Sequence, residues 1–167
     1  MKNKEKIVVF GGSGFLGSHV CDALSEQNYD VVIFDSENSN YINDKQKMHK
    51  GDILNIEQVE EAVEGSKYVY HFAGLADINE TKNKPIETVQ SNILGTTYIL
   101  EACKKYDVDR LIFASTIYVY SELGSFYRVT KQACEKLIEE YNNQFNIEYT
   151  ILRYGSLYGP RANKFNF

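Results

Sequence analysis

The sequence lacks the features that mark disulfide-bonded, metal-binding and membrane proteins. It has only three cysteines, Cys21, Cys103 and Cys134, which lie far apart without a C-x-x-C pair, so we expect no disulfide framework and no metal site. No stretch approaches the roughly 18 apolar residues that span a bilayer. The apolar run before Gly11 is too short for a signal peptide. With only two prolines and no linker-like segment, the 167 residues predict one domain, located in the cytoplasm and without membrane contact.

The sequence also has no excess of basic residues. Lys and Arg number 18 and Asp and Glu number 23, which gives a formal net charge of −5. A nucleic-acid-binding domain usually presents a basic face to phosphates, so we expect no nucleic acid partner. The hydrophobic content of 43% is ordinary for a globular domain and excludes a disordered chain. A small molecule is the expected ligand.

Short apolar runs alternate with longer stretches of helical periodicity. The runs predict strands at 6–10, 31–34, 48–53, 68–73, 110–115 and 149–154. The periodic stretches predict helices at 15–27, 56–63, 87–105 and 127–143. Near-continuous apolar strands are typical of parallel sheets buried on both faces. The fold class is therefore expected to be α/β, a doubly wound parallel Rossmann sheet of about six strands with helices on both faces.

A glycine-rich turn follows the first predicted strand and opens the first predicted helix. Gly11, Gly14 and Gly17 have the spacing at which glycines allow a tight turn, close approach of a pyrophosphate and packing of helix on strand. The amino end of the helix would offer free N–H groups to the anion. The turn therefore predicts a dinucleotide site, and the alternative is a turn that is merely rich in glycine.

Two aspartates follow the second and third predicted strands. Asp35 lies 18 residues beyond Gly17, where a carboxylate can bind the ribose hydroxyls of an adenosine and repel a 2′-phosphate, which favours NAD over NADP. Asp52 ends the third predicted strand, where an adenine edge would lie. The structural alternatives are a solvated or capping acid at Asp35 and a loop residue capping the next helix at Asp52.

A second group of residues has the pattern of a proton-transfer site. Tyr127 and Lys131 are four residues apart, so they lie on one face of a helix, and a neighbouring ammonium would lower the pKa of the tyrosine. Such a tyrosine can act as a general acid or base near neutral pH. Ser115 and Thr116 end the fifth predicted strand, at the sheet edge where open α/β sheets bind ligands. Each motif also has a structural explanation, as a chance spacing or a capping hydroxyl.

Taken together, these motifs resemble those of the extended short-chain dehydrogenase/reductase superfamily, in its NAD-dependent epimerase/dehydratase branch. The supporting segments are Gly11–His19, Gly51–Ile53, His71–Gly74, Asn92 with Gly95 and Thr96, Ser115–Thr116, Tyr127–Lys131, Leu152–Tyr154 and Tyr158–Arg161. They extend over almost the whole chain.

The resemblance implies NAD as cofactor and assigns a role to each matching residue. The implied cofactor-binding residues are Gly11, Gly14, Phe15, Leu16 and Gly17 at the pyrophosphate, Asp35 at the ribose, Asp52 and Ile53 at the adenine, and Phe72, Ala73, Gly74, Ser115, Tyr127 and Lys131 along the rest of the cofactor. Tyr127 would be the acid/base, Lys131 would hold the nicotinamide ribose, and Thr116 would assist at the reacting sugar oxygen.

The implied activity is that of a nucleotide-sugar epimerase, in which a hydride passes transiently to NAD. Dehydratases of the branch carry an Asp-Glu pair after the threonine, whereas Ile117 and Tyr118 follow Thr116, so dehydration is disfavoured. A nucleotide-sugar ketoreductase using the same tyrosine and lysine is an alternative. Another is a catalytically silent dinucleotide-binding module.

Relatives continue beyond the segment that matches Tyr158–Arg161 into a smaller substrate-binding portion. We therefore expect residues 1–167 to be an NAD-binding Rossmann domain with the C-terminal substrate domain mostly absent. The resemblance also implies a homodimer formed through the helices at 87–105 and 127–143. Apolar residues of these helices, Leu100, Cys103, Leu137 and Ile138, could serve either the dimer or the core.

Overall fold

The computed structural model describes residues 4–162, whose six strands form one parallel sheet. The strands are β1 (Lys6–Phe10), β2 (Asp30–Asp35), β3 (Gln46–Lys50), β4 (Ser66–His71), β5 (Arg110–Thr116) and β6 (Tyr149–Tyr154). The helices are α1 (Phe15–Glu26), α2 (Ile56–Val63), α3 (Ile78–Asn83), α4 (Pro85–Val89), the π-helix η1 (Gln90–Leu94), α5 (Gly95–Lys105), the 3₁₀-helix η2 (Ile117–Tyr120) and α6 (Ser125–Phe145).

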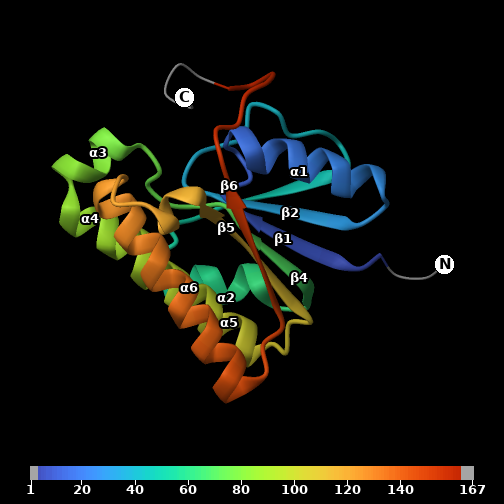
Figure 1. Ribbon diagram of the computed structural model, residues 1–167. Coiled ribbons are helices and arrows are strands. Elements are labelled where there is room, and N and C mark those ends of the chain that lie inside the picture. The colour runs from blue at the N-terminus through green and yellow to red at the C-terminus, as the bar shows by residue number, and fades with distance from the viewer. Residues whose placement is uncertain (1–3, 163–167) are drawn as a thin grey trace.

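The strand order is β3-β2-β1-β4-β5-β6, which is the order of the dinucleotide-binding Rossmann fold. Helix α1 lies on one side of the sheet, and α2, α5 and α6 lie on the other (Figure 1). The expected doubly wound sheet with helices on both faces is therefore confirmed.

The alternation of side chains along β1 divides the core into two layers. Val8 and Phe10 point into the larger cluster, with residues of α2, α5 and α6, while Ile7 and Val9 join the cluster beneath α1. All four are essentially inaccessible to solvent, as expected for a central strand of a parallel sheet.

The third strand was predicted at the wrong place. It spans Gln46–Lys50 rather than 48–53, so Asp52 lies two residues beyond its end. The Gly51 backbone lies against the Phe34 ring so closely that an added Cβ would approach the ring to 2.7 Å. The Asp52 carboxylate then accepts a hydrogen bond from the Leu54 N–H at 2.9 Å, which turns the chain toward α2.

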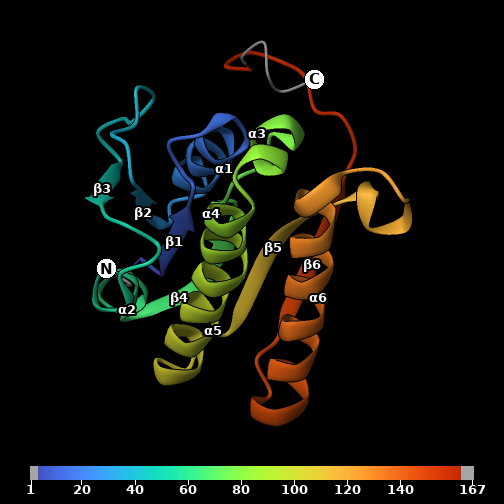
Figure 2. The same cartoon turned by 90° about the vertical axis from the view of Figure 1, so that its left-hand side faces the viewer.

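The long helix expected at 87–105 is interrupted by a π-helical turn. Helix α4 begins at Pro85, η1 widens the helix over Gln90–Leu94, and α5 continues to Lys105. This composite helix runs beside α6 on one face of the sheet (Figure 2). The α1 side is less completely covered, because α1 packs on β1 and β2. A cavity of about 290 Å³ there is lined by Tyr68, Tyr70 and Ile112, among others.

Candidate active site

The parallel sheet brings the ends of separate strands to a single edge. Strands β2 and β4 flank β1, and the registers pair Phe10 with both Phe34 and His71, so these strands end side by side. The chain passes from β1 to β2 on one side, whereas β4, which follows β3 in the chain, pairs with β1 on its other side. The strand order therefore reverses at this edge, which makes it the topological switch point where such sheets bind ligands.

The glycine-rich turn sits at this edge under steric constraints that only glycine meets. Gly11 has φ +76°, and a Cβ there would lie 2.6 Å from the backbone nitrogen of Ala73. A Cβ on Gly17 would lie 2.2 Å from the carbonyl oxygen of Gly11. The turn is thus packed against the Phe72–Gly74 segment, and α1 starts directly after Gly14. Because the first-turn N–H groups of a helix have no partner within it, the turn fits a bound pyrophosphate.

Asp35 ends β2 next to this turn. Its carboxylate accepts hydrogen bonds from the backbone N–H groups of Ser13 at 3.0 Å and Glu37 at 3.2 Å. The carboxylate is therefore fixed beside the glycine turn, where it fits a ribose. Asp52 is exposed, and the structure gives it a turn-forming role, while an adenine contact by Asp52 or by the half-buried Ile53 stays a prediction.

The expected proton-transfer residues meet at the neighbouring corner, between β5 and α6. Tyr127 and Lys131 occupy the first two turns of α6, and Thr116 ends β5. Lys131 is only 6% exposed, and its Nζ donates to the Ala114 carbonyl at 2.7 Å. The same Nζ lies 5.9 Å from the centre of the Tyr127 ring.

The expected lowering of the Tyr127 pKa is wrong for this structure. Burial raises the pKa of Tyr127, and the Thr116 side chain opposes that effect only in part. Burial also lowers the pKa of Lys131 to about 8, because a charged ammonium is poorly solvated there. The spacing of the two residues on a helix was read correctly, but sequence spacing does not report how far a site is desolvated.

The structure also adds Glu135 and Arg153 to this corner, two residues that the sequence analysis left without a role. Ser115 donates to Glu135 at 2.5 Å, and Arg153 of β6 pairs with the same carboxylate at 2.7 Å. Glu135 follows Lys131 by four residues, a spacing that could have indicated a shared face. A direct cofactor contact by Ser115 stays a prediction, since its hydroxyl is engaged by Glu135.

Asn92, in the π-helix, links three segments around the site. Its side-chain oxygen accepts from the Leu75 N–H at 2.8 Å, and its amide group donates to the Leu75 carbonyl and the Thr130 hydroxyl, each at 3.0 Å. Nearby, the fully buried His71 contacts the Thr96 hydroxyl at 2.9 Å, and burial holds its pKa well below the usual value. His71 is therefore neutral at physiological pH.

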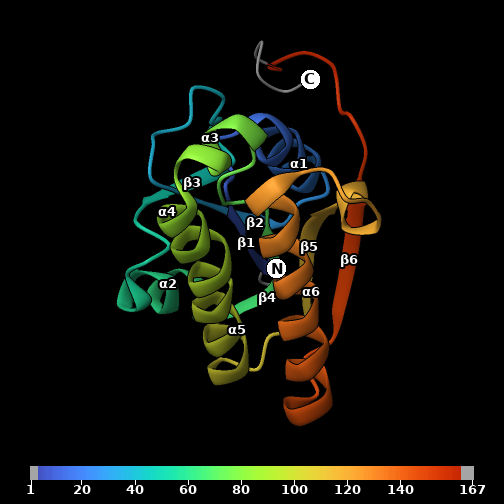
Figure 3. The same cartoon turned by 60° about the vertical axis from the view of Figure 1, so that its left-hand side comes forward.

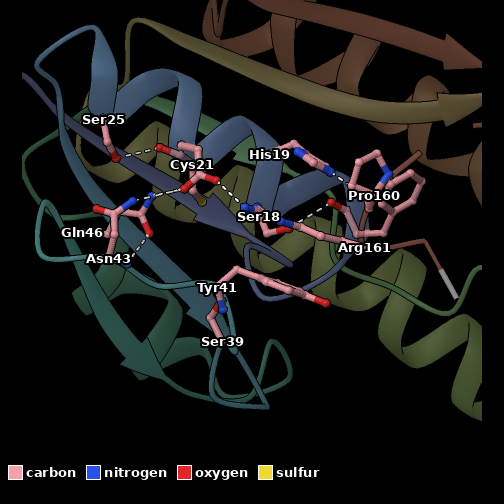
Figure 4. A network of polar contacts seen from close by, with 12 residues as sticks. Ser18, His19, Cys21, Ser25, Ser39, Tyr41, Asn43, Gln46, Pro160 and Arg161 are labelled. Atoms are coloured by element: carbon pink, nitrogen blue, oxygen red, sulfur yellow. Dashed lines mark hydrogen bonds and ion pairs between the residues drawn. The ribbon is translucent and has the colours of Figure 1, made fainter. Parts of the chain in front are cut away.

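The segment after β6 returns across α1 (Figure 4). Arg161 pairs with Asp22 at 2.7 Å and stacks over the Tyr41 ring, 4.5 Å from its centre. His19 contacts the Pro160 carbonyl oxygen at 2.9 Å. Although burial acts against it, the hydrogen bonds from Arg161 and Gln46 hold the pKa of Asp22 below its ordinary value. Through its contacts with Asp22 and Tyr41, Arg161 therefore joins α1 to the loop that follows Asp35.

Membrane-spanning helices and metal-binding clusters are both absent from residues 4–162. None of the helices there combines the length and the apolar character that a membrane crossing requires. Across the same residues, the His, Cys, Asp and Glu side chains form no group of three or more that could hold a metal ion.

Comparison with known proteins identifies the family. The family model described as "NAD dependent epimerase/dehydratase family" matches residues 7–166. A "Putative UDP-glucose 4-epimerase" of Methanocaldococcus jannaschii is 37% identical over 94% of this chain and 57% of its own length.

Solved structures give the same result. A UDP-glucose 4-epimerase of Thermotoga maritima with UDP-glucose superposes with a TM-score of 0.89 at 30% identity, over 95% of this chain and 58% of its own. The Thermus thermophilus UDP-glucose 4-epimerase in complex with NAD gives 0.87 at 28% identity, over 95% and 57%. The present chain thus spans little more than half the length of these relatives. It belongs to the NAD-dependent epimerase/dehydratase family.

Proposed function

We propose that this chain is the cofactor-binding part of an NAD-dependent nucleotide-sugar epimerase. The observation that carries the proposal is the meeting, at one edge of the sheet, of a glycine turn, the Asp35 carboxylate and the Thr116–Tyr127–Lys131 corner. The names of its relatives agree with this function, since they include UDP-glucose 4-epimerases in complex with NAD or UDP-glucose.

The chain's own residues fit the two ends of a dinucleotide. Gly11, Gly14 and Gly17, with the N–H groups of Phe15 and Leu16, would hold the pyrophosphate, and Asp35 would bind the adenosine ribose and disfavour a 2′-phosphate. Phe72, Ala73 and Gly74 would line the cofactor beyond the turn, and Lys131 would hold the nicotinamide ribose. The bound nicotinamide would supply hydride transfer, accepting a hydride from the sugar and returning it.

The protein's contribution to the reaction is to move and hold one proton. Tyr127 would take the proton from a sugar hydroxyl onto its phenolate oxygen and return it after the sugar has turned. The Thr116 hydroxyl would hydrogen-bond the same sugar oxygen. Since burial raises the Tyr127 pKa, the acid form prevails in the structure described, and the phenolate must be stabilised by charge brought close to it.

Most of the nucleotide-sugar would be bound by polypeptide outside residues 1–167. The proposal is supported by the share of 57% that the chain covers in the Methanocaldococcus relative. A location in the cytoplasm is also proposed, since Cys21, Cys103 and Cys134 are all buried free thiols, as suits a reducing compartment.

We further propose a homodimer through the α4–α5 and α6 side of the molecule. Leu100, Cys103 and Ile138 belong to the core, as their alternative interpretation predicted, so they cannot form the interface. Other apolar side chains on adjacent elements are exposed instead, namely Ile86, Val89, Leu94, Phe126 and Val129. The helices that carry them run side by side on this face (Figure 3). Sedimentation equilibrium should give twice the chain mass, and a monomer at micromolar concentration would refute the dimer.

Calorimetric titration of the chain with NAD⁺ and NADP⁺ tests the proposed cofactor. We expect NAD⁺ to bind in preference, and Asp35→Asn to weaken NAD⁺ binding at least about tenfold through loss of a charge-assisted hydrogen bond. Asp30→Asn is the matched control, because Asp30 starts the same strand at the opposite edge. Failure of both dinucleotides to bind would rule out the proposal.

A second stage tests the chemistry with UDP-glucose. Interconversion of the C4 epimers without net consumption of NADH supports an epimerase, and net NADH oxidation would instead indicate a ketoreductase. Tyr127→Phe should abolish either reaction and leave NAD⁺ affinity nearly unchanged. Binding of NAD⁺ without turnover would mean that residues 1–167 do not form a complete substrate site by themselves.

A further inference from the structure

A buried carboxylate lies one turn beyond Lys131 on α6. Glu135 is 6% exposed, and its Oε1 accepts hydrogen bonds from the Ser115 hydroxyl at 2.5 Å and from Arg153 Nε at 2.9 Å. Its Oε2 accepts from Arg153 Nη2 at 2.7 Å. Arg153 and Glu135 therefore form a bidentate ion pair, in which two nitrogens donate to the carboxylate, and such pairs are among the strongest hydrogen-bonded pairs in proteins.

This network joins the three elements that form the proton-transfer corner. Ser115 and Arg153 are register partners on β5 and β6, and Ser115 precedes Thr116. Glu135 belongs to α6, the helix of Tyr127 and Lys131. One side chain thus ties the carboxyl ends of both strands to the helix turn that follows the lysine.

Glu135 also places a negative charge one helical turn from Lys131 on α6. The titratable groups near this ammonium are Tyr127 and Cys134 on α6, whose pKa values burial raises, and His71 on β4, whose pKa burial lowers. All three are uncharged at neutral pH. Glu135, by contrast, is a carboxylate, and its negative charge favours the protonated form of Lys131.

We propose that Glu135 is a positioning residue, which holds the ends of β5 and β6 against α6 and supplies the negative charge that balances the buried Lys131 ammonium. This inference rests on the proposed function, because Lys131 matters only if it serves the cofactor and Tyr127. Arg153 pairs directly with the carboxylate, whereas the Lys131 Nζ donates to the Ala114 carbonyl, so the arginine offsets part of the negative charge that acts on Lys131.

The opposed charges of Glu135 and Arg153 give a test with shifts of two opposite signs. The pKa of Lys131 can be followed directly in the full chain by the ¹³Cε and ¹⁵Nζ shifts of labelled lysine, with Lys131→Arg identifying the signal. Glu135→Gln should lower the midpoint by about 1 pH unit or more, because the ammonium loses its counter-charge. Arg153→Gln should raise the midpoint, because the arginine then no longer offsets the negative charge of the carboxylate.

Matched variants separate this role from a merely structural one. Glu135→Asp should keep the midpoint close to that of the wild type. Glu139→Gln, one turn further along α6, removes a carboxylate that pairs with Lys136 and should not move the midpoint. If Glu135→Gln leaves the midpoint unchanged, or Glu139→Gln shifts it equally, the proposal is overturned. If Glu135→Gln does not fold, Arg153→Gln is the deciding test. A rise of the Lys131 midpoint supports the proposal, and a fall or no change overturns it.

The titration needs no bound cofactor, so the two hypotheses fail separately. Absence of NAD⁺ binding would refute the proposed function while the Lys131 midpoint still responded to Glu135. Normal NAD⁺ binding with an unresponsive midpoint would refute only the positioning role.

Discussion

The two corners of the candidate site are built in different ways. The glycine turn after β1 depends on backbone geometry, with Gly11 and Gly17 placed where a Cβ would overlap main-chain atoms. The corner between β5 and α6 depends on buried polar side chains, with Lys131 and Glu135 each 6% exposed. The first corner should therefore fail by steric overlap and the second by a change in charge.

Substitution of Gly17 should give the largest effect. In Gly17→Ala the new Cβ would lie 2.2 Å from the Gly11 carbonyl oxygen, so the turn must shift. We expect the free energy of unfolding to fall by about 3 kcal/mol, the upper range for overpacking, together with loss of NAD⁺ binding. Urea denaturation and calorimetric titration measure the two effects.

Gly14→Ala is the control for stability. Its Cβ would meet the Gly11 carbonyl oxygen at 3.3 Å, and Gly14 has φ −76°, which any residue adopts. Its destabilisation should be well below that of Gly17→Ala. Equal destabilisation by the two substitutions would show that steric overlap does not define this corner.

Removal of the buried Lys131 ammonium should change the free energy of unfolding less than Gly17→Ala does, and should increase it. The Lys131 pKa falls from 10.5 to about 8 on folding, so the folded protein binds fewer protons than the unfolded chain between these pH values. Stability should accordingly rise as the pH increases from 8 to 10.5. Lys131→Met should stabilise the protein by about 2 kcal/mol at pH 7, roughly half the full linkage value, because the bond to Ala114 is lost.

The gain in Lys131→Met should shrink as the pH rises from 8 to 10.5 and disappear above 10.5, where the wild-type lysine becomes neutral in both states. Urea denaturation at a series of pH values measures it. Lys136→Met, an exposed lysine on the same helix, should not reproduce this pH dependence. If the stability difference between Lys131→Met and the wild type does not change with pH, burial of the charged ammonium does not destabilise the fold.

The sequence was sufficient to predict those features that depend on local sterics and on the periodicity of apolar residues. The strands at Lys6–Phe10 and Tyr149–Tyr154 and the helix at Ile56–Val63 begin and end where predicted. The glycine turn was predictable for the same reason, since its glycines are required within a few residues of one another. The third strand was misplaced because it ends at Lys50, before Gly51, whose backbone lies against the ring of Phe34, a residue of another strand that the local pattern does not reveal.

The electrostatics of the acid–base corner could not be predicted from spacing. The Tyr127 pKa follows from burial, which depends on how α6 packs on β5, and that packing involves residues far apart in the chain. The network of Glu135 with Ser115 and Arg153 joins positions 18 and 20 residues apart for the same reason. A helical period shows which residues share a face, but not what that face touches.

The π-helical turn at Gln90–Leu94 holds one residue more than an α-helical turn of the same height. Within it lies Asn92, whose amide reaches both Leu75 and Thr130, and whose carbonyl accepts from the Thr96 hydroxyl at 2.5 Å and the Cys134 thiol at 3.1 Å. A single residue of this irregular turn thus serves as a junction between the loop after β4 and the helix of the acid–base pair.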